Sequence, residues 1–194
     1  TNKFTKFFVN NLDWTFRNIN FESGLTGQFL AKLKNVNYEA KNTSIFKNDT
    51  TSEFFGALGY LTKVDLIKQS DNDTKHFLSP KALFKYSPNH MRKETEEVRL
   101  NHLNIFSLDR LNTLNNFESG TNVTLGFDYK MEKNNKELDF SIGQSISAAE
   151  NSSMPSSSSL DQRFSDIVGN ATYKVTDNID FSYNFAIDQN YNDL

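Results

Sequence analysis

Apolar and polar residues alternate along most of this chain, and the alternation is clearest between Thr121 and Met131. After Thr121, the apolar face of this stretch consists of Val123, Leu125, Phe127, Tyr129 and Met131. The opposite face consists of Asn122, Thr124, Gly126, Asp128 and Lys130. A period of two residues is typical of a β-strand with one apolar and one polar face.

Seven other stretches show the same alternation and are separated by polar segments. They are Phe4–Phe16, Leu25–Leu33, Phe54–Leu66, Pro80–Pro88, Leu138–Ile146, Ile167–Val175 and Ile179–Ile187. Pro80 has no N–H group to donate to a neighbouring strand, so we expect its strand to begin at that residue. The pattern therefore predicts an all-β fold, an antiparallel segment of about eight long strands.

The lengths of these stretches favour a transmembrane β-barrel over a soluble sheet. Most of them span 9 to 13 residues, whereas soluble strands average about 5–6 residues and membrane-spanning strands need about 9–11. Tyrosines near the predicted strand ends fit the aromatic girdles of outer-membrane barrels. These tyrosines are Tyr38, Tyr60, Tyr86, Tyr129, Tyr173 and Tyr183. A soluble β-sandwich or a lipocalin-like barrel would show the same alternation with its apolar face directed inward.

The connections between the stretches support the membrane interpretation. Bacterial barrels join their strands by short periplasmic turns and longer outer loops. The connections at 132–136 and 176–178 are short, as are those at 20–24 and 67–75, while those at 39–50 and 147–163 are long. If short connections are periplasmic, the remaining segment, 89–119, has to be one long extracellular loop without a spanning strand.

Composition excludes several classes of protein. There is no Cys, which rules out disulfides and thiolate metal sites within this sequence. The net charge of −3 and the pI of about 5.6 are atypical of a nucleic-acid-binding protein. A mean hydropathy of −0.61 does not exclude a barrel, because spanning strands alternate apolar and polar residues. The sequence begins with Thr1 rather than Met, so we expect it to be a piece of a longer protein.

Four motifs occur in a distinctive order between residues 78 and 147. They are Leu78–Pro88 (LSPKALFKYSP), Asn104–Leu111 (NIFSLDRL), Asn116–Gly120 (NFESG) leading into Thr121–Tyr129, and Ser141–Ile146 (SIGQSI). In this order they resemble the barrel domain of the LptD family, the lipopolysaccharide-assembly or organic solvent tolerance proteins. The segment Leu111–Phe117 departs from the family pattern, because it lacks the Gly and Arg found there.

The resemblance implies a function in lipopolysaccharide transport. It suggests that residues 1–194 are part of one outer-membrane barrel domain, with the extracellular loop at about 89–119. The N-terminal periplasmic domain and the remaining strands would lie outside this sequence. The implied role is insertion of lipopolysaccharide into the outer leaflet of the bacterial outer membrane. The expected partners are lipopolysaccharide, outer-membrane lipid, an LptE-like lipoprotein plug and, through the N-terminal domain, the periplasmic lipopolysaccharide-bridge proteins. Nucleic acid and cofactors are not expected.

Two groups of residues are candidates for the site. The polar faces of the predicted strands supply ten lumen-facing candidates: Gln28, Lys32, Lys34, Lys63, Lys81, Lys85, Asn122, Thr124, Asp128 and Lys130. The lysines among them would either meet anionic sugar phosphates or simply be solvated. The loop motif supplies a second group with a structural role, in which Asp109 and Arg110 would fix the loop over the barrel mouth by ion pairing. This group consists of Asp109, Arg110, Glu118 and Gly120.

Three alternatives stay open at this point. A self-closed eight-stranded barrel with a structural or adhesion role would require Phe4–Phe16 to pair with Phe181–Ile187. A soluble ligand-binding β-barrel would fit the alternation alone. An outer-membrane enzyme would need Ser107, His102 and Asp109 to converge, and the nucleophile elbow typical of serine hydrolases is missing. The histidines show no metal-type spacing, so we expect neither an enzyme nor a metal site.

Overall fold

A computed structural model describes all residues except 1–3, 45, 71–72, 89, 177 and 190–194. Four predicted connections therefore include residues outside the described part: 39–50 (Ile45), 67–75 (Asp71 and Asn72), 89–119 (Asn89) and 176–178 (Asp177). The strands are β1 (Phe4–Thr15), β2 (Ile19–Asn20), β3 (Leu25–Lys41), β4 (Thr50–Val64), β5 (Leu66–Gln69), β6 (Lys75–Ser87), β7 (Gly120–Lys133), β8 (Lys136–Ser147), β9 (Ile167–Thr176) and β10 (Ile179–Ile187). One short 3₁₀ helix spans Ser156–Ser158.

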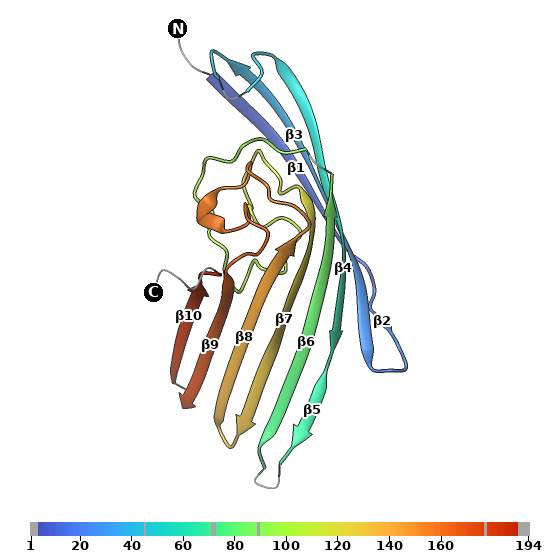
Figure 1. The fold of residues 1–194 in the computed structure, drawn as a ribbon, viewed down its shortest axis with the longest axis vertical. Coiled ribbons are helices and arrows are strands. Elements are labelled where there is room, and N and C mark those ends of the chain that lie inside the picture. Colours follow the sequence, from blue (N-terminus) through green and yellow to red (C-terminus); the bar gives the residue numbers. More distant parts are fainter. Residues whose placement is uncertain (1–3, 45, 71–72, 89, 177, 190–194) are drawn as a thin grey trace.

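All ten strands belong to one antiparallel sheet (Figure 1). Its order is β1-β3-β4-β6-β7-β8-β9-β10, with β2 beside β3 and β5 beside β6. The all-β, antiparallel fold with eight long strands is thus confirmed. The sheet is open, with β1 and β10 at its two edges. The described strands do not form the pairing between Phe4–Phe16 and Phe181–Ile187 that a self-closed barrel would require.

β3 continues eight residues beyond the predicted end at Leu33, to Lys41, so that the connection to β4 spans 42–49. The alternation does not reveal this extension, because the apolar residues change from one face of the strand to the other. Up to Leu33 the apolar residues occupy odd positions, but Val36, Tyr38 and Ala40 occupy even ones and are buried. These three side chains pack under a loop, so Tyr38 was wrongly assigned to an aromatic girdle.

Pro80 does not begin its strand, as the sequence suggested, but lies inside β6. The neighbouring strand is interrupted at this place: β4 pairs with β6 up to Lys63 opposite Lys81, and β5 resumes the pairing with Leu66 opposite Leu78. Proline is tolerated there because no backbone hydrogen bond to the neighbouring strand requires an N–H donor between those two pairs. The Ser79 hydroxyl donates to the Asp65 carboxylate across the gap, at 2.7 Å.

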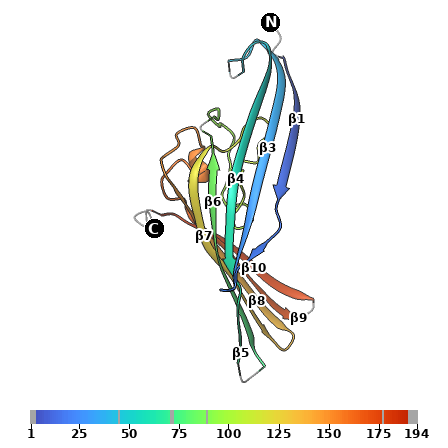
Figure 2. The same ribbon diagram turned by 90° about the vertical axis from the view of Figure 1, so that its right-hand side faces the viewer.

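Connections alternate in length along the sheet. Short turns at 21–24, 70–74 and 134–135 lie at one end, and the connections at 88–119 and 148–166 lie at the other. Figures 1 and 2 show that these two long loops fold back over one face of the sheet beside the upper parts of β6, β7 and β8. We call this the inner face and the opposite one the outer face. Among the described residues, no helix has the length and apolar character needed to cross a membrane.

The two faces differ in exposure as the alternation predicts. On the outer face Val123 is 36% and Leu125 48% exposed, while Thr124 on the inner face is fully buried. Further large apolar side chains are exposed on the remaining strands, among them Phe8, Leu12, Trp14, Phe29, Leu33, Phe54, Leu58, Phe84, Phe181 and Tyr183. The buried core lies instead between the inner face and the loops, where Phe55 and Leu83 of the sheet meet Leu108 and Phe117 of the 88–119 loop.

Candidate functional site

The ten residues predicted to line a lumen share the inner face. Residues directly opposite one another in an antiparallel pair project from the same side of a sheet. Through this rule the pairings of Lys34 with Phe55, Lys63 with Lys81, and Lys85 with Asn122 connect β3, β4, β6 and β7 on one side. The 88–119 and 148–166 loops cover part of this face. Under them Lys34, Lys85, Asn122 and Thr124 are buried, while the other six candidates are half-buried. Whether this face lines a lumen stays a prediction.

Each of the six lysines of this set forms an ion pair within the chain, an arrangement that the sequence did not indicate. Each lies within 4 Å of a carboxylate of the same chain. The pairs are Lys32–Asp13 (3.2 Å), Lys34–Asp109 (3.0 Å), Lys63–Asp65 (3.0 Å), Lys81–Asp128 (2.7 Å), Lys85–Glu118 (2.7 Å) and Lys130–Glu132 (2.7 Å). The alternation predicts on which face of the sheet a lysine lies. It does not predict that a carboxylate from a neighbouring strand or a loop forms an ion pair with that lysine.

Glu118 is the centre of a buried ionic cluster between the 88–119 loop and the sheet. Arg110 binds its carboxylate in a bidentate manner, with Nε 2.9 Å from Oε2 and Nη2 in contact with Oε1. The backbone N–H of Arg110 also donates to Oε2, at 3.1 Å. From β6, Lys85 Nζ approaches Oε1 to 2.7 Å, an ion pair without the directionality of a hydrogen bond. All three side chains are at most 2% exposed.

A second ion pair ties the loop to β3. Lys34 Nζ donates to the Asp109 carboxylate at 3.0 Å and to the carbonyls of Thr113 and Asn116 at 2.6 and 2.8 Å. All three donors of the ammonium group are thereby used. The other carboxylate oxygen of Asp109 accepts the backbone N–H of Glu118, at 3.2 Å, and so joins this pair to the ionic cluster. The segment that departs from the family pattern is thus bound to β3 through two of its backbone carbonyls.

The electrostatics of Glu118 favour its ionised form. Burial by itself raises the pKa of a carboxyl group. Here the positive charges of Arg110 and Lys85, together with the hydrogen bonds from Arg110, outweigh burial and lower the pKa of Glu118 to about 2. The fourth residue of the predicted loop motif, Gly120, has a φ of +114°, a conformation that glycine adopts readily. It leads the chain from Glu118 into β7.

Aromatic packing brings two of the sequence motifs together. A Cβ at Gly143 of β8 would lie 3.1 Å from the Phe106 ring of the loop, and a Cβ at Gly126 of β7 would lie 3.0 Å from it. Lys81 Nζ stands 4.4 Å from the centre of the same ring. The loop therefore packs into a shallow depression of the sheet. The depression forms because two glycines without side chains face each other there. Sequence reasoning missed this contact, although Gly126 interrupts an otherwise bulky strand pattern.

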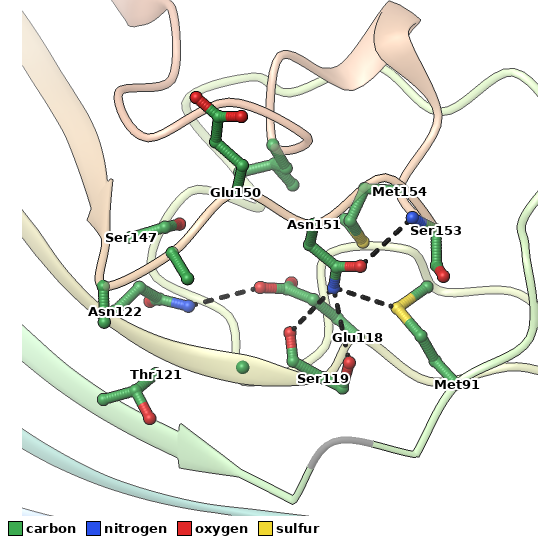
Figure 3. Close-up of a pocket in the computed structure, with 14 residues that line it drawn as sticks. Met91, Glu118, Ser119, Thr121, Asn122, Ser147, Glu150, Asn151, Ser153 and Met154 are labelled. Atoms are coloured by element: carbon green, nitrogen blue, oxygen red, sulfur yellow. Dashed lines mark hydrogen bonds between the residues drawn. The ribbon is translucent and has the colours of Figure 1, made fainter.

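A cavity of about 330 Å³ lies beside the ionic cluster, between the two long loops (Figure 3). Its walls come from residues 118–122, 147–151 and 153–154 and from Met91, with Leu160 closing one side. Asn151 holds these walls together, because its Nδ2 contacts the Ser119 carbonyl and hydroxyl oxygens at 3.4 and 3.3 Å. Its Oδ1 accepts the backbone N–H of Ser153 at 3.1 Å. The sequence pattern gave no indication of this cavity, because its lining residues lie in separate loops.

The residues considered for catalysis have other contacts. The Ser107 hydroxyl donates to the backbone carbonyl of Asp109 at 3.1 Å, and the Asp109 carboxylate is engaged by Lys34 and the Glu118 N–H. No contact between His102 and either residue is observed in the described part of the chain. His90 stacks on Phe55, with 5.1 Å between ring centres. These contacts give Ser107, Asp109 and His90 a structural role.

Comparison with known proteins connects this architecture to a family. No curated protein matches the chain. The family model described as LPS transport system D, LptD, matches residues 11–194. That range contains the ionic cluster, both long loops, all strands from β2 to β10 and the last five residues of β1. Because the match extends over most of its length, the chain belongs to the LptD family of lipopolysaccharide transport proteins.

Proposed function

We propose that this chain forms part of the wall of an outer-membrane β-barrel that inserts lipopolysaccharide into the outer leaflet. The observation that carries the proposal is the contrast between the faces of β7: Leu125 is half-exposed on the outer face, whereas Asn122 and Thr124 are buried on the inner one. Exposed apolar side chains on long strands are costly in water and suit contact with lipid. The inner face would then line the lumen.

Within this proposal, the placement of the loops gives the orientation of the barrel wall in the membrane. Outer-membrane barrels have short periplasmic turns and long extracellular loops. The turns at 21–24, 70–74 and 134–135 would therefore face the periplasm, and the 88–119 and 148–166 loops would cover the extracellular mouth. An LptE-like plug and the periplasmic bridge proteins would contact parts of the complete protein at the lumen and at the periplasmic side.

The charge pattern of the inner face suits passage of a polyanion. Below the loops, Lys81 is paired with Asp128, and Lys130 with Glu132 and Glu137. Paired charges can hydrate sugars and phosphates, but they offer a phosphate group less net attraction than free lysines would. In this proposal the inner face conducts lipopolysaccharide without holding it tightly, and no catalytic step is needed.

Photo-crosslinking in cells tests the proposal. A crosslinking amino acid is placed at Asp128, on the inner face, or at Leu125, on the outer face of the same strand, in the full-length protein. We expect lipopolysaccharide adducts at position 128 and membrane-lipid adducts at position 125. Lipopolysaccharide adducts at neither position, or equally at both, would overturn the proposed role of the inner face.

A further inference from the structure

We propose that the cavity between the two long loops binds an uncharged sugar ring of the saccharide, rather than a phosphate group. This inference rests on the proposed function and assigns a ligand class to the cavity. At about 330 Å³ the cavity falls at the lower end of the range of roughly 300–1,000 Å³ that is usual for small-molecule sites. The cavity lies at the ends of β7 and β8 that the long loops cover. A saccharide that emerges from the lumen would pass this position.

The charges around the cavity argue against an anionic ligand. No Lys, Arg or His contributes to its lining, whereas Glu118 and Glu150 do. Lys85 and Arg110 are both bound to the Glu118 carboxylate, and neither forms part of the cavity wall. A phosphate here would find no cation in the cavity wall to bind it, which is unfavourable in a partly buried site.

A divalent cation is also a poor fit. Glu118 Oε1 already receives Arg110, Lys85 and, at 3.4 Å, the Asn122 amide. Over the described residues, no group of three acidic or histidine side chains is arranged to hold a metal ion. The cavity therefore offers polar but largely neutral surroundings to a ligand.

Asn122 supplies the specific indication that a hydroxyl-bearing ligand binds. Its side chain is only 4% exposed and lines the cavity, and its Oδ1 has no hydrogen-bond partner among the described residues. A buried carbonyl oxygen without a partner is destabilising, and a sugar hydroxyl is a donor that would satisfy it. Figure 3 shows the Asn122 side chain at the edge of the cavity, with its nitrogen directed at Glu118.

The remaining wall combines the two kinds of contact that a sugar ring makes. The side chains of Ser147 and Ser153 add hydroxyl groups, and Met91, Met154 and Leu160 add an apolar side. Methionine adapts its shape to a ligand, so the two thioethers can pack against the C–H face of a ring. The contacts of Asn151 with Ser119, Ser153 and Met91 hold the wall in place before any ligand arrives.

Calorimetry on the purified full-length protein in detergent tests the inference. The probes are the dephosphorylated core oligosaccharide of the host lipopolysaccharide, inorganic phosphate and calcium. We expect the oligosaccharide to bind and the two ions not to bind at this cavity. Ala149→Phe, at the exposed rim, should weaken oligosaccharide binding about tenfold or more by filling the cavity. Ser152→Phe, in the same loop but outside the lining, is the matched control and should bind like the native protein.

Asn122→Ala gives an independent check of the hydroxyl contact. It should weaken binding of the oligosaccharide while the loops stay as protected from protease as in the native protein. Equal binding by the native protein and Ala149→Phe, or preferential binding of phosphate, would overturn the inference. If crosslinking of lipopolysaccharide at position 128 persists in that case, the proposed function stands and only the sugar site fails. If crosslinking is lost but the oligosaccharide still binds, the proposed function fails and the sugar site stands.

Discussion

Phe106 of the 88–119 loop packs on Gly143 of β8, so closely that a Cβ on this glycine would lie 3.1 Å from the ring. The contact joins a loop residue to the strand two elements further along the chain. Ile105 lies beside the same glycine, at 3.2 Å from the position of such a Cβ. The absence of a side chain at residue 143 therefore determines how deeply the loop settles on the inner face.

Gly143→Val should displace the loop and lower the free energy of unfolding by about 1–3 kcal/mol, the usual cost of overpacking a tight contact. Phe106→Leu should recover part of this loss, because the smaller side chain leaves space for the valine. Denaturant unfolding of the two single variants and the double variant in detergent measures the coupling between them. Strictly additive losses would show that Phe106 does not press on Gly143.

Glu118→Gln should destabilise the protein more than Arg110→Met does. Removing the carboxylate leaves two buried cations, Arg110 and Lys85, without their partner, and breaking a buried pair in this way costs about 3–5 kcal/mol. Removing Arg110 leaves Glu118 paired with Lys85 at 2.7 Å, so its cost should be smaller. Chemical unfolding and protease protection of the 88–119 loop rank the two variants. The reverse order would mean that Lys85 contributes little to holding Glu118.

Periodicity predicted the strands well, because the two faces of a long strand lie in different environments, as Thr124 and Leu125 of β7 show. The resemblance of the loop motif, rather than periodicity, pointed to Asp109 and Arg110 as ion-pairing residues and included Glu118 in the same structural group. Periodicity failed where the environment of one strand changes along its length. β3 shows this: its even positions pass from Lys34 to Val36 and Tyr38, so the pattern appears to stop while the strand continues.

Contacts between distant segments could not be predicted from the sequence. Lys34 and Asp109 are 75 residues apart, and nothing in a period of two residues tells which lysine of a polar face will meet a loop. The cavity is a stronger case, since Met91, Asn122 and Met154 come together only after both loops have folded onto the sheet. These features depend on how the loops pack, which local patterning does not encode.

Lys34→Met should destabilise the loop strongly, whereas Lys32→Met on the same strand should have little effect. The first variant leaves the Asp109 carboxylate and two backbone carbonyls without their donor in a buried place, which we expect to cost about 3–5 kcal/mol. Lys32 pairs with Asp13, whose side chain is 65% exposed, and such surface pairs contribute about 0–1 kcal/mol. Thermal unfolding in detergent, with mass-spectrometric mapping of protease cuts between residues 109 and 116, compares them. Similar losses from both variants would contradict the anchoring role of Lys34.

Acid should release the 88–119 loop within a defined range of pH. The pKa of Glu118 is about 2 in the folded protein against an ordinary value of 4.5, because the charges of Arg110 and Lys85 outweigh burial. A lowered pKa means that ionised Glu118 stabilises the fold fully above about pH 4.5. The stabilisation then falls as the pH drops toward 2, below which the group contributes nothing more. The total is on the order of 3 kcal/mol, taking about 1.4 kcal/mol for each pKa unit.

Pepsin, which is active in this range, can measure the release directly. The rate at which it cuts the 88–119 loop in the native protein should rise as the pH falls from 4.5 toward 2, after correction for the pH dependence of pepsin on an unfolded substrate. Glu118→Gln, which cannot ionise, should be cut faster than the native protein at pH 5 and should lack the part of the pH dependence that Glu118 causes. A native loop that stays equally protected at pH 5 and pH 2, or a variant with the same pH dependence as the native protein, would show that this carboxylate does not hold the loop on the sheet.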